Sequence, residues 1–174
     1  MAIVAVFDFD QTLCDTSSLK PSRDARDWAA CRERGAALPF RPGVRDALRR
    51  LAEDGATLGI ATTSPGDAYA APFLRRLGIP TAFLLDYFAA RDLPKPPGAG
   101  RRAGIKAAQL REVRRRYPDG RVVFVGDDAD DAEGARIADV AFVHACFGGA
   151  CAGIGGTHAG TAGELARAVA AAAR

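Results

Sequence analysis

Short apolar runs that alternate with amphipathic helical patterns constrain the fold of this 174-residue chain more than any other feature. The first run, residues 3–7, is almost continuously apolar, as in a strand that is buried on both faces. Similar runs follow at residues 57–61, 121–125 and 140–143, and a shorter one at 82–85. This alternation is typical of βαβ units, and it predicts an α/β fold with a central parallel sheet.

Helical periodicity fills the segments between these runs. Residues 43–54 place their apolar side chains on one face, with a proline near the start and a glycine after the end. Residues 65–77 follow Ser64 as a predicted N-cap, and Pro72 is expected to kink or split that helix. The Gly-rich residues 147–163 are expected to form a loop. Further helices are predicted at residues 104–116, 130–138 and 162–173.

The chain has the length of one ordinary domain, and neither a linker nor a repeat divides it, so residues 1–174 are expected to form a single domain. The net charge of +3 is too small to indicate nucleic-acid binding. No apolar run reaches the roughly 20 residues that span a membrane. The short apolar N-terminal stretch lacks the basic lead-in and cleavage site of a signal peptide. These features predict a cytoplasmic protein that does not enter a membrane.

The four cysteines, at positions 14, 31, 146 and 151, form no CxxC pair. In a cytosolic chain this pattern favours small buried thiols over a disulfide or a zinc site. His144 and His158 lie near the last two cysteines, but the Gly-rich sequence between them matches no common zinc spacing.

Polar residues follow three of the predicted strands at the point where each strand ends. Asp8 and Asp10 follow the first strand, residues 62–64 add hydroxyl groups after the second, and residues 126–131 form another acidic cluster. Ligands bind beyond the carboxyl ends of parallel strands, so these groups are expected to meet in one crevice. Close carboxylates need a balancing cation such as Mg²⁺, and the hydroxyls and amides at a helix start suit an anionic oxygen.

In these motifs the sequence resembles the haloacid dehalogenase superfamily, over nearly the whole chain. The resemblance implies a Rossmann-like three-layer α/β/α domain and a Mg²⁺-dependent phosphohydrolase that acts on a phosphomonoester through an aspartyl-phosphate. The matching residues, in the order and spacing of the family, are Asp8, Asp10 and Thr12 of a DxDxT motif, Thr62 at the end of an apolar strand, and Gly126, Asp127 and Asp131 of a GDxxxD motif.

The resemblance also implies a role for each carboxylate. Asp8 is the expected nucleophile. Asp10 is expected to protonate the leaving oxygen and then to deprotonate the attacking water. Asp8 and Asp127, together with the backbone carbonyl of Asp10, are expected to hold Mg²⁺, which screens the approach of a carboxylate to phosphate. Asp131 is expected to support the metal or to orient a ligand.

The family also binds the phosphoryl oxygens with hydroxyl groups and a lysine. Thr62 and Thr63 are the expected hydroxyl residues. Two lysines compete for the third motif: Lys106 lies near the start of a predicted helix, and Lys95 precedes a proline, as in many relatives. Glycines separate Lys95 from any helix, so Lys106 is favoured and Lys95 stays the alternative.

Residues 14–41 form the only sizeable insertion after the first motif, and they are expected to act as a rudimentary cap. One helix is predicted there, at about 24–34, with Trp28 as its apolar anchor. Such a small cap implies an open site, which suits a bulky substrate, a macromolecular end, or an oligomer in which a neighbour supplies the lid. Gln11 departs from the family, because most family phosphatases carry Gly there, and its side chain is expected to reach the substrate or crowd the loop.

Several alternatives stay open at the level of sequence. The same residues would serve a phosphotransferase, and a non-catalytic member would bind a phosphorylated ligand or a partner protein. Dehalogenation needs no metal and fits the acidic motifs less well. A receiver domain would be shorter and would lack DxDxT. The substrate is either a phosphorylated small molecule or a phosphorylated macromolecular end.

Overall fold

A computed structural model describes residues 2–35, 37–66, 70–147 and 153–174. Within these residues a six-stranded sheet has the order β3-β2-β1-β4-β5-β6, and all of its neighbouring strands are parallel. The strands are β1 (Ile3–Phe7), β2 (Thr57–Ala61), β3 (Phe83–Leu85), β4 (Arg121–Gly126), β5 (Ala141–Ala145) and β6 (Thr157–Ala159). The predicted central parallel sheet is confirmed.

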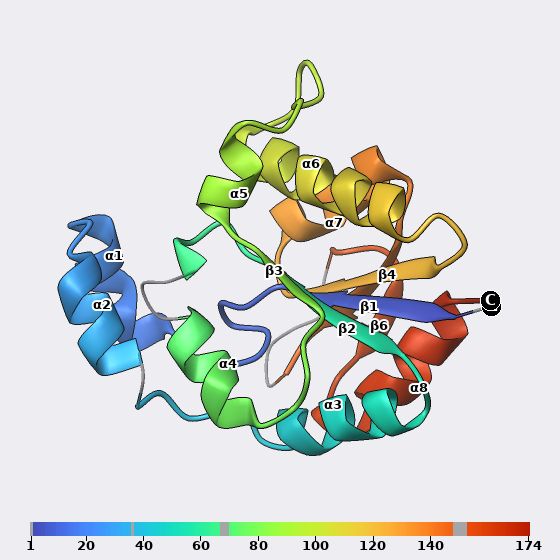
Figure 1. Ribbon diagram of the computed structural model, residues 1–174, viewed down its shortest axis with the longest axis horizontal. Helices are drawn as coiled ribbons and strands as arrows, with labels where there is room; N and C mark the ends of the chain where they lie inside the picture. Colours follow the sequence, from blue (N-terminus) through green and yellow to red (C-terminus); the bar gives the residue numbers. More distant parts are fainter. Residues whose placement is uncertain (1, 36, 67–69, 148–152) are drawn as a thin grey trace.

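Helices cover both faces of the sheet and complete a Rossmann-like three-layer fold, as Figure 1 shows. The helices α3 and α8, with α4 beside them, lie on one side, and α6 and α7 lie on the other. The short helix α5 packs beside α6. Their bounds are α3 (Val44–Glu53), α4 (Ala71–Leu77), α5 (Tyr87–Arg91), α6 (Arg101–Arg116), α7 (Ala129–Ala138) and α8 (Ala162–Ala172).

The continuous apolar run of β1 follows from this sandwich. Ala5 and Phe7 join the core cluster on the side of α3 and α8, whereas Val4 and Val6 join the cluster under α6 and α7. Successive side chains of a strand point to opposite faces, so a strand covered on both faces must be apolar at every position.

The strand order reverses at β1, which places the ends of β1 and β4 side by side. The chain moves from β1 to β2 and β3 in one direction, and β4 then returns to the other side of β1. The last residue of β1, Phe7, is the register partner of Val125, and the amide of Asp8 donates to the Val125 carbonyl at 2.8 Å. Such a switch point is where α/β sheets bind ligands.

The segment between β1 and α3 contains more helices than the sequence predicted. Instead of one helix at 24–34, it has a 3₁₀ helix η1 (Ser17–Leu19) followed by α1 (Lys20–Asp24) and α2 (Trp28–Gly35). Arg26 adopts a left-handed backbone, with φ of 56°, and turns the chain between α1 and α2. A left-handed residue cannot continue a right-handed helix, so the predicted helix is divided.

The two ends of this segment are held together. Cys14 forms an antiparallel bridge with Phe40, and the amide of Arg41 donates to the Leu13 carbonyl at 2.9 Å. The chain therefore leaves the α/β sandwich after β1 and returns to it at almost the same point. In Figure 1, α1 and α2 project at one end of the molecule, beyond the carboxyl ends of the strands.

Two other boundaries differ from those predicted. The helix expected at 65–77 is seen as α4, whose N-cap is Ala70 rather than Ser64, while residues 67–69 lie outside the described part. Pro72 lies in the first turn, where a missing amide hydrogen costs no helical bond, so it does not kink α4. The loop expected at 147–163 contains β6, which is too short and polar to show as an apolar run.

The cysteines divide into two groups. Cys14 and Cys31 are free and buried, as expected. Cys146 is disulfide-bonded, which contradicts the expectation of a thiol, and Cys151 lies outside the described residues. Among the described helices, none has the length and apolar character that crossing a membrane requires.

Candidate active site

A buried ion cluster lies where β1, β2 and α7 meet. Asp8 follows β1 directly, and its carboxylate contacts the ammonium group of Lys106 on α6. Nζ of Lys106 also donates to the Ala61 carbonyl at 2.9 Å and lies 3.1 Å from Oδ1 of Asp131. The side chains of Lys106 and Asp131 are wholly buried, and Asp8 is nearly so. Lys106 therefore ties the ends of β1 and β2 to α7.

Asp127 completes the acidic cluster from the end of β4. One carboxylate oxygen each from Asp8, Asp127 and Asp131 lie within 4.8 Å of one another. Thr12 Oγ1 donates to Asp127 Oδ1 at 3.1 Å, and the Asp127 amide donates to Asp131 Oδ2 at 3.2 Å. Nε2 of His144 lies 3.1 Å from the Asp127 carbonyl oxygen. The two predicted acidic motifs thus meet at one point.

The cluster carries more negative than positive charge, because the carboxylates of Asp8, Asp127 and Asp131 face the single ammonium group of Lys106. Burial raises the pKa values of Asp8 and Asp131, although the charge of Lys106 opposes this in both. Burial, followed by the charges of Asp131 and Asp128, raises the pKa of Asp127 to about 7. Burial alone would lower the pKa of Lys106, but Asp131 and Asp8 raise it, so Lys106 stays charged. A divalent cation bound by carboxylate oxygens would relieve the remaining repulsion.

Two glycines beside this cluster occupy positions where a larger residue would not fit. A Cβ on Gly126 would lie 2.4 Å from Asp131 Oδ2, and a Cβ on Gly134 would lie 2.5 Å from the Cβ of Lys106. Gly126 therefore lets Asp131 approach the end of β4. Gly134 lets α7 pack against α6 at the position of Lys106.

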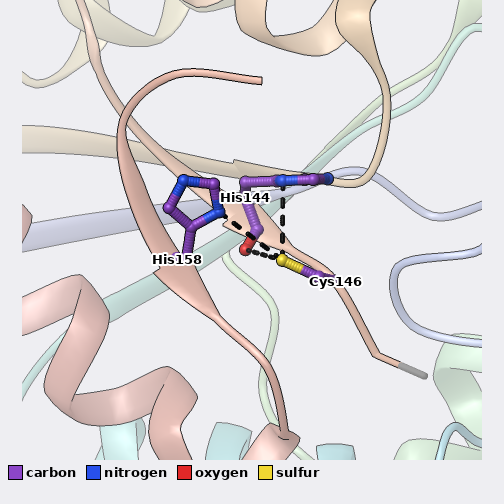
Figure 2. Close-up of side chains that lie close together, drawn as sticks. All are labelled: His144, Cys146 and His158. Atoms are coloured by element: carbon purple, nitrogen blue, oxygen red, sulfur yellow. Dashed lines mark hydrogen bonds between the residues drawn. The ribbon is translucent and has the colours of Figure 1, made fainter. Parts of the chain in front are cut away.

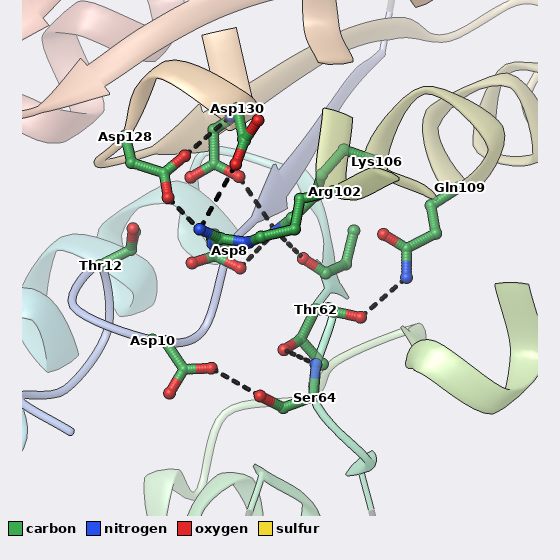
Figure 3. A network of polar contacts seen from close by, with 12 residues as sticks. Asp8, Asp10, Thr12, Thr62, Ser64, Arg102, Lys106, Gln109, Asp128 and Asp130 are labelled. Atoms are coloured by element: carbon green, nitrogen blue, oxygen red, sulfur yellow. Dashed lines mark hydrogen bonds and ion pairs between the residues drawn. The ribbon is translucent and has the colours of Figure 1, made fainter. Parts of the chain in front are cut away.

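The carboxylate of Asp10 points away from the acidic cluster. Its Oδ1 accepts from Arg23 Nη1 at 2.6 Å, and its Oδ2 accepts from Ser64 Oγ at 3.0 Å. Figure 3 shows Asp10 facing Ser64 below the group around Asp8. These two partners hold the carboxylate of Asp10, and its backbone carbonyl stays the group that is predicted to bind the metal.

The end of β2 is fixed by a glutamine. Nε2 of Gln109 on α6 donates to the carbonyl oxygens of Thr62 and Leu85, at 2.8 and 2.9 Å. Thr62 is wholly buried, and its Oγ1 accepts the amide hydrogen of Ser64 at 3.1 Å, which leaves the hydroxyl hydrogen for another acceptor. Thr63 lies closer to solvent and lines the pocket described next.

A pocket of about 570 Å³ opens above Asp8 and Asp10. Its lining combines carboxylates, hydroxyl residues, four arginines and two aromatic side chains. The lining residues are Asp8, Asp10, Gln11, Arg23, Arg26, Trp28, Thr63, Ser64, Pro65, Tyr87, Arg101, Arg102, Asp127 and Asp128. Arg102 is held by ion pairs to Asp128 and Asp130, at 2.9 and 3.4 Å (Figure 3).

The structure separates the two candidate lysines. Lys106 lies in the acidic cluster, whereas Lys95 is exposed and donates to the Arg91 carbonyl at 2.8 Å. Because α6 begins at Arg101 rather than at about 104, Lys106 lies in the second turn of the helix and not in its first turn.

Gln11 has a structural role that the sequence did not reveal. Its φ is 62°, a left-handed conformation that costs other residues more than glycine. Arg41 Nη2 donates to Gln11 Oε1 at 2.6 Å, and Arg41 Nε donates to the Gln11 carbonyl at 3.0 Å. The side chain of Gln11 therefore braces the loop after β1, and it also lines the pocket.

The sequence did not indicate three residues that contact the predicted ones: Arg23, Gln109 and His144. Gln109 lies three residues after Lys106, so helical spacing could have placed both on one face. Ser64 was predicted both as a hydroxyl residue after the second strand and as a helix cap, but its contact with Asp10 was not expected. No signal pointed to Arg23, because its contact depends on how α1 folds back over the loop after β1.

The fold and this site define a Rossmann-like α/β protein with an acidic centre at the switch point of its sheet, and the comparisons with known proteins agree. A family model, haloacid dehalogenase-like hydrolase, matches residues 21–139. The chain therefore belongs to the haloacid dehalogenase-like hydrolase family and is an enzyme of that family. The matched span begins after Asp8 and Asp10 and includes Thr62, Lys106, Asp127 and Asp131. No curated protein matches the sequence.

Solved structures of similar fold cover nearly the whole chain. A haloacid dehalogenase-superfamily hydrolase of subfamily IA from Geobacter sulfurreducens has a TM-score of 0.68 and 17% identity, over 95% of this chain and 98% of that one. The D,D-heptose 1,7-bisphosphate phosphatase from B. bronchiseptica, complexed with magnesium and phosphate, has a TM-score of 0.67 and 20% identity, over 98% and 99%. A haloacid dehalogenase-like protein from Streptococcus pneumoniae has a TM-score of 0.67 and 16% identity, over 94% and 96%.

Proposed function

We propose that this protein is a Mg²⁺-dependent phosphohydrolase that cleaves a phosphomonoester through an aspartyl-phosphate on Asp8. The observation that carries the proposal is the contact of the buried Asp8 carboxylate with Lys106, beside Asp127 and at the edge of an arginine-lined pocket. The magnesium and phosphate bound by the phosphatase of similar fold support the same chemistry.

In the first step, a carboxylate oxygen of Asp8 attacks phosphorus and the ester P–O bond breaks. Lys106 keeps its proton and holds the other side of the carboxylate, so it orients the nucleophile, and its charge favours the ionised carboxylate against the effect of burial. Asp10 gives its proton to the leaving oxygen. Thr62 and Thr63 lie at the end of β2 and would hydrogen-bond the phosphoryl oxygens, Thr62 through its hydroxyl hydrogen while its oxygen accepts the Ser64 amide.

In the second step, Asp10 takes a proton from water, the water oxygen bonds to phosphorus, and the bond between Asp8 and phosphorus breaks to release inorganic phosphate. The contacts of Asp10 with Arg23 and Ser64 position its carboxylate. Arg23 must turn away for Asp10 to carry a proton, and an anionic substrate gives the guanidinium another group to bind.

The acidic cluster fits the metal that this family uses. Asp8 and Asp127, together with the backbone carbonyl of Asp10, would hold Mg²⁺, and Asp131 would support it through its contact with the Asp127 amide. All of these donors are oxygens, which a hard divalent cation prefers. When bound, the ion supplies positive charge that lowers the repulsion between the Asp8 carboxylate and the phosphate.

The pocket favours a phosphorylated small molecule. Its volume of about 570 Å³ lies within the roughly 300–1,000 Å³ of small-molecule sites. Residues 14–41 would form a rudimentary cap on the single domain, and its Trp28 and Arg26 contribute to the pocket wall beside Arg101. These side chains suit a substrate with a second anionic or planar group. A phosphorylated macromolecular end would use the same arginines.

The test compares the wild type, Asp8→Asn and a surface control, Asp92→Asn, on an aryl phosphate with Mg²⁺ or a chelator. We expect Mg²⁺-dependent release that falls on the order of 10³-fold or more in Asp8→Asn and is unchanged in Asp92→Asn. Equal release of phosphate and aryl alcohol indicates hydrolysis, whereas a phosphate deficit with an added alcohol indicates transfer. Unchanged turnover in Asp8→Asn would rule out the proposed nucleophile.

A further inference from the structure

A second cluster of metal-ligating side chains lies at the carboxyl ends of β5 and β6. His144 and His158 are register partners in the two strands, and Cys146 directly follows β5. Sγ of Cys146 lies 3.5 Å from Nδ1 of His144 and 3.6 Å from Nδ1 of His158 (Figure 2). His144 and Cys146 are buried, whereas His158 is exposed. Two imidazole nitrogens and one sulfur thus converge at the edge of the sheet.

These distances fit the dimensions of a tetrahedral zinc site. Zn–S bonds of about 2.3 Å and Zn–N bonds of about 2.0–2.1 Å place sulfur and nitrogen ligands roughly 3.5–3.6 Å apart. Both sulfur–nitrogen distances here have that value. Ligand atoms of the three residues all lie within 4.8 Å of one another. A small rotation of the exposed His158 side chain would bring the two imidazole nitrogens to the distance that a zinc site requires.

The ring of His144 is already oriented as in a metal ligand. Its Nε2 lies 3.1 Å from the Asp127 carbonyl, which can only accept a hydrogen bond, so Nε2 carries the proton. In the neutral ring, Nδ1 is then a bare lone pair, and it points at Cys146. Metal-ligating histidines almost always donate their other ring N–H in this manner.

We propose that His144, Cys146 and His158 form a Zn²⁺ site when Cys146 is a thiolate. Cys146 is disulfide-bonded, so a dithiol or phosphine reductant must first supply two electrons and convert the S–S bond into two thiols. The Cys146 thiol loses its proton as it binds the metal. Sulfur and imidazole donors suit zinc and not magnesium, in contrast to the all-oxygen cluster around Asp8. A further donor or water completes the shell, and the inference does not depend on the proposed phosphatase activity.

The test uses the full-length protein, freed of metal and reduced with a phosphine, with Co²⁺ as a spectroscopic substitute for Zn²⁺ and excess Mg²⁺ present. We expect one equivalent of Co²⁺ to give tetrahedral visible bands and a thiolate-to-cobalt charge-transfer band, both of which Zn²⁺ abolishes. Cys146→Ser should lose the charge-transfer band. His158→Ala, an exposed position, should weaken Co²⁺ binding by at least about tenfold.

Two controls separate this site from other cobalt binding. Asp8→Asn and Cys31→Ser should keep the charge-transfer band, because neither residue belongs to the proposed site. The protein without reductant should lack the band, and adding the phosphine should restore it. Absence of the band in the reduced wild type would overturn the proposal, and so would its persistence in Cys146→Ser or in unreduced protein.

Discussion

At the scale of single residues, Gln11 combines an unfavourable backbone conformation with side-chain hydrogen bonds that stabilise the loop after β1. The left-handed conformation costs a non-glycine residue roughly 1–2 kcal/mol. Two hydrogen bonds from Arg41 offset this cost. Replacement by glycine removes the strain together with the side-chain hydrogen bonds from Arg41 and to Thr16, whereas replacement by alanine removes the same hydrogen bonds and keeps the strain.

We therefore predict that Gln11→Gly is more stable than Gln11→Ala by about 1–2 kcal/mol. Urea denaturation of both variants and the wild type gives the two free energies of unfolding. Equal stabilities of the glycine and alanine variants would show that the backbone at position 11 is not strained.

The two lysines offer a matched pair of substitutions. Lys106→Met leaves buried carboxylates without their cation, which costs about 3–5 kcal/mol of stability, and it removes the partner of Asp8. We expect Lys106→Met to lose phosphatase activity, and Lys95→Met to keep it within about twofold, because Lys95 is exposed. Steady-state kinetics and thermal unfolding of both variants test this prediction. A large loss of activity in Lys95→Met would instead assign the phosphate-binding role to Lys95.

At the scale of secondary-structure elements, the close packing of α6 and α7 sets the position of Lys106. A methyl group on Gly134 would lie 2.5 Å from the Cβ of Lys106, so one helix must move. At Gly163 on α8, a methyl group would meet Thr161 Oγ1 at 3.7 Å, an ordinary van der Waals contact.

We predict that Gly134→Ala costs about 1–3 kcal/mol and lowers activity. Gly163→Ala should leave activity unchanged and stabilise α8 by up to about 1 kcal/mol. Chemical denaturation and turnover of the two variants provide the comparison. A Gly134→Ala protein with normal stability and turnover would contradict the role given to this helix contact.

The same scale shows what the sequence could and could not predict. The strands and the motifs that follow them were predictable, because apolar runs mark strands and parallel strands bring their ends together. The division into α1 and α2 was not, since it depends on the left-handed Arg26. The contact of Arg23 with Asp10 depends on that fold, and the His144–His158 pairing depends on the register of β5 and β6. Neither is encoded in local spacing.

At the scale of the whole molecule, the acidic cluster makes stability depend on pH and metal together. The pKa of Asp127 rises from 3.8 to about 7 on folding. Between these values the folded state keeps a proton that the unfolded chain has lost, so this group's contribution to stability is present at low pH and is lost as pH rises. Mg²⁺ bound at the proposed site would compete with that proton.

We predict that the melting temperature of metal-free protein falls as pH rises through this window, and that the increase produced by Mg²⁺ grows with pH. In Asp127→Asn, the melting temperature and the increase produced by Mg²⁺ should both depend less on pH, because the titrating carboxyl group is gone. Thermal unfolding over a pH series, with and without Mg²⁺, measures both effects. A Mg²⁺ effect that shrinks as pH rises would be inconsistent with metal binding at this cluster.

Asp8 carries the phosphoryl group in the proposed reaction, and trapping that aspartyl-phosphate tests the proposed function most directly. Protein mixed with a phosphomonoester and Mg²⁺, quenched in acid within the first turnover and analysed by peptide mass spectrometry, should carry one added phosphoryl group on the peptide that contains Asp8. Asp8→Asn, treated identically, should carry none. Turnover without a phosphorylated Asp8 peptide, or the same adduct in Asp8→Asn, would contradict the account.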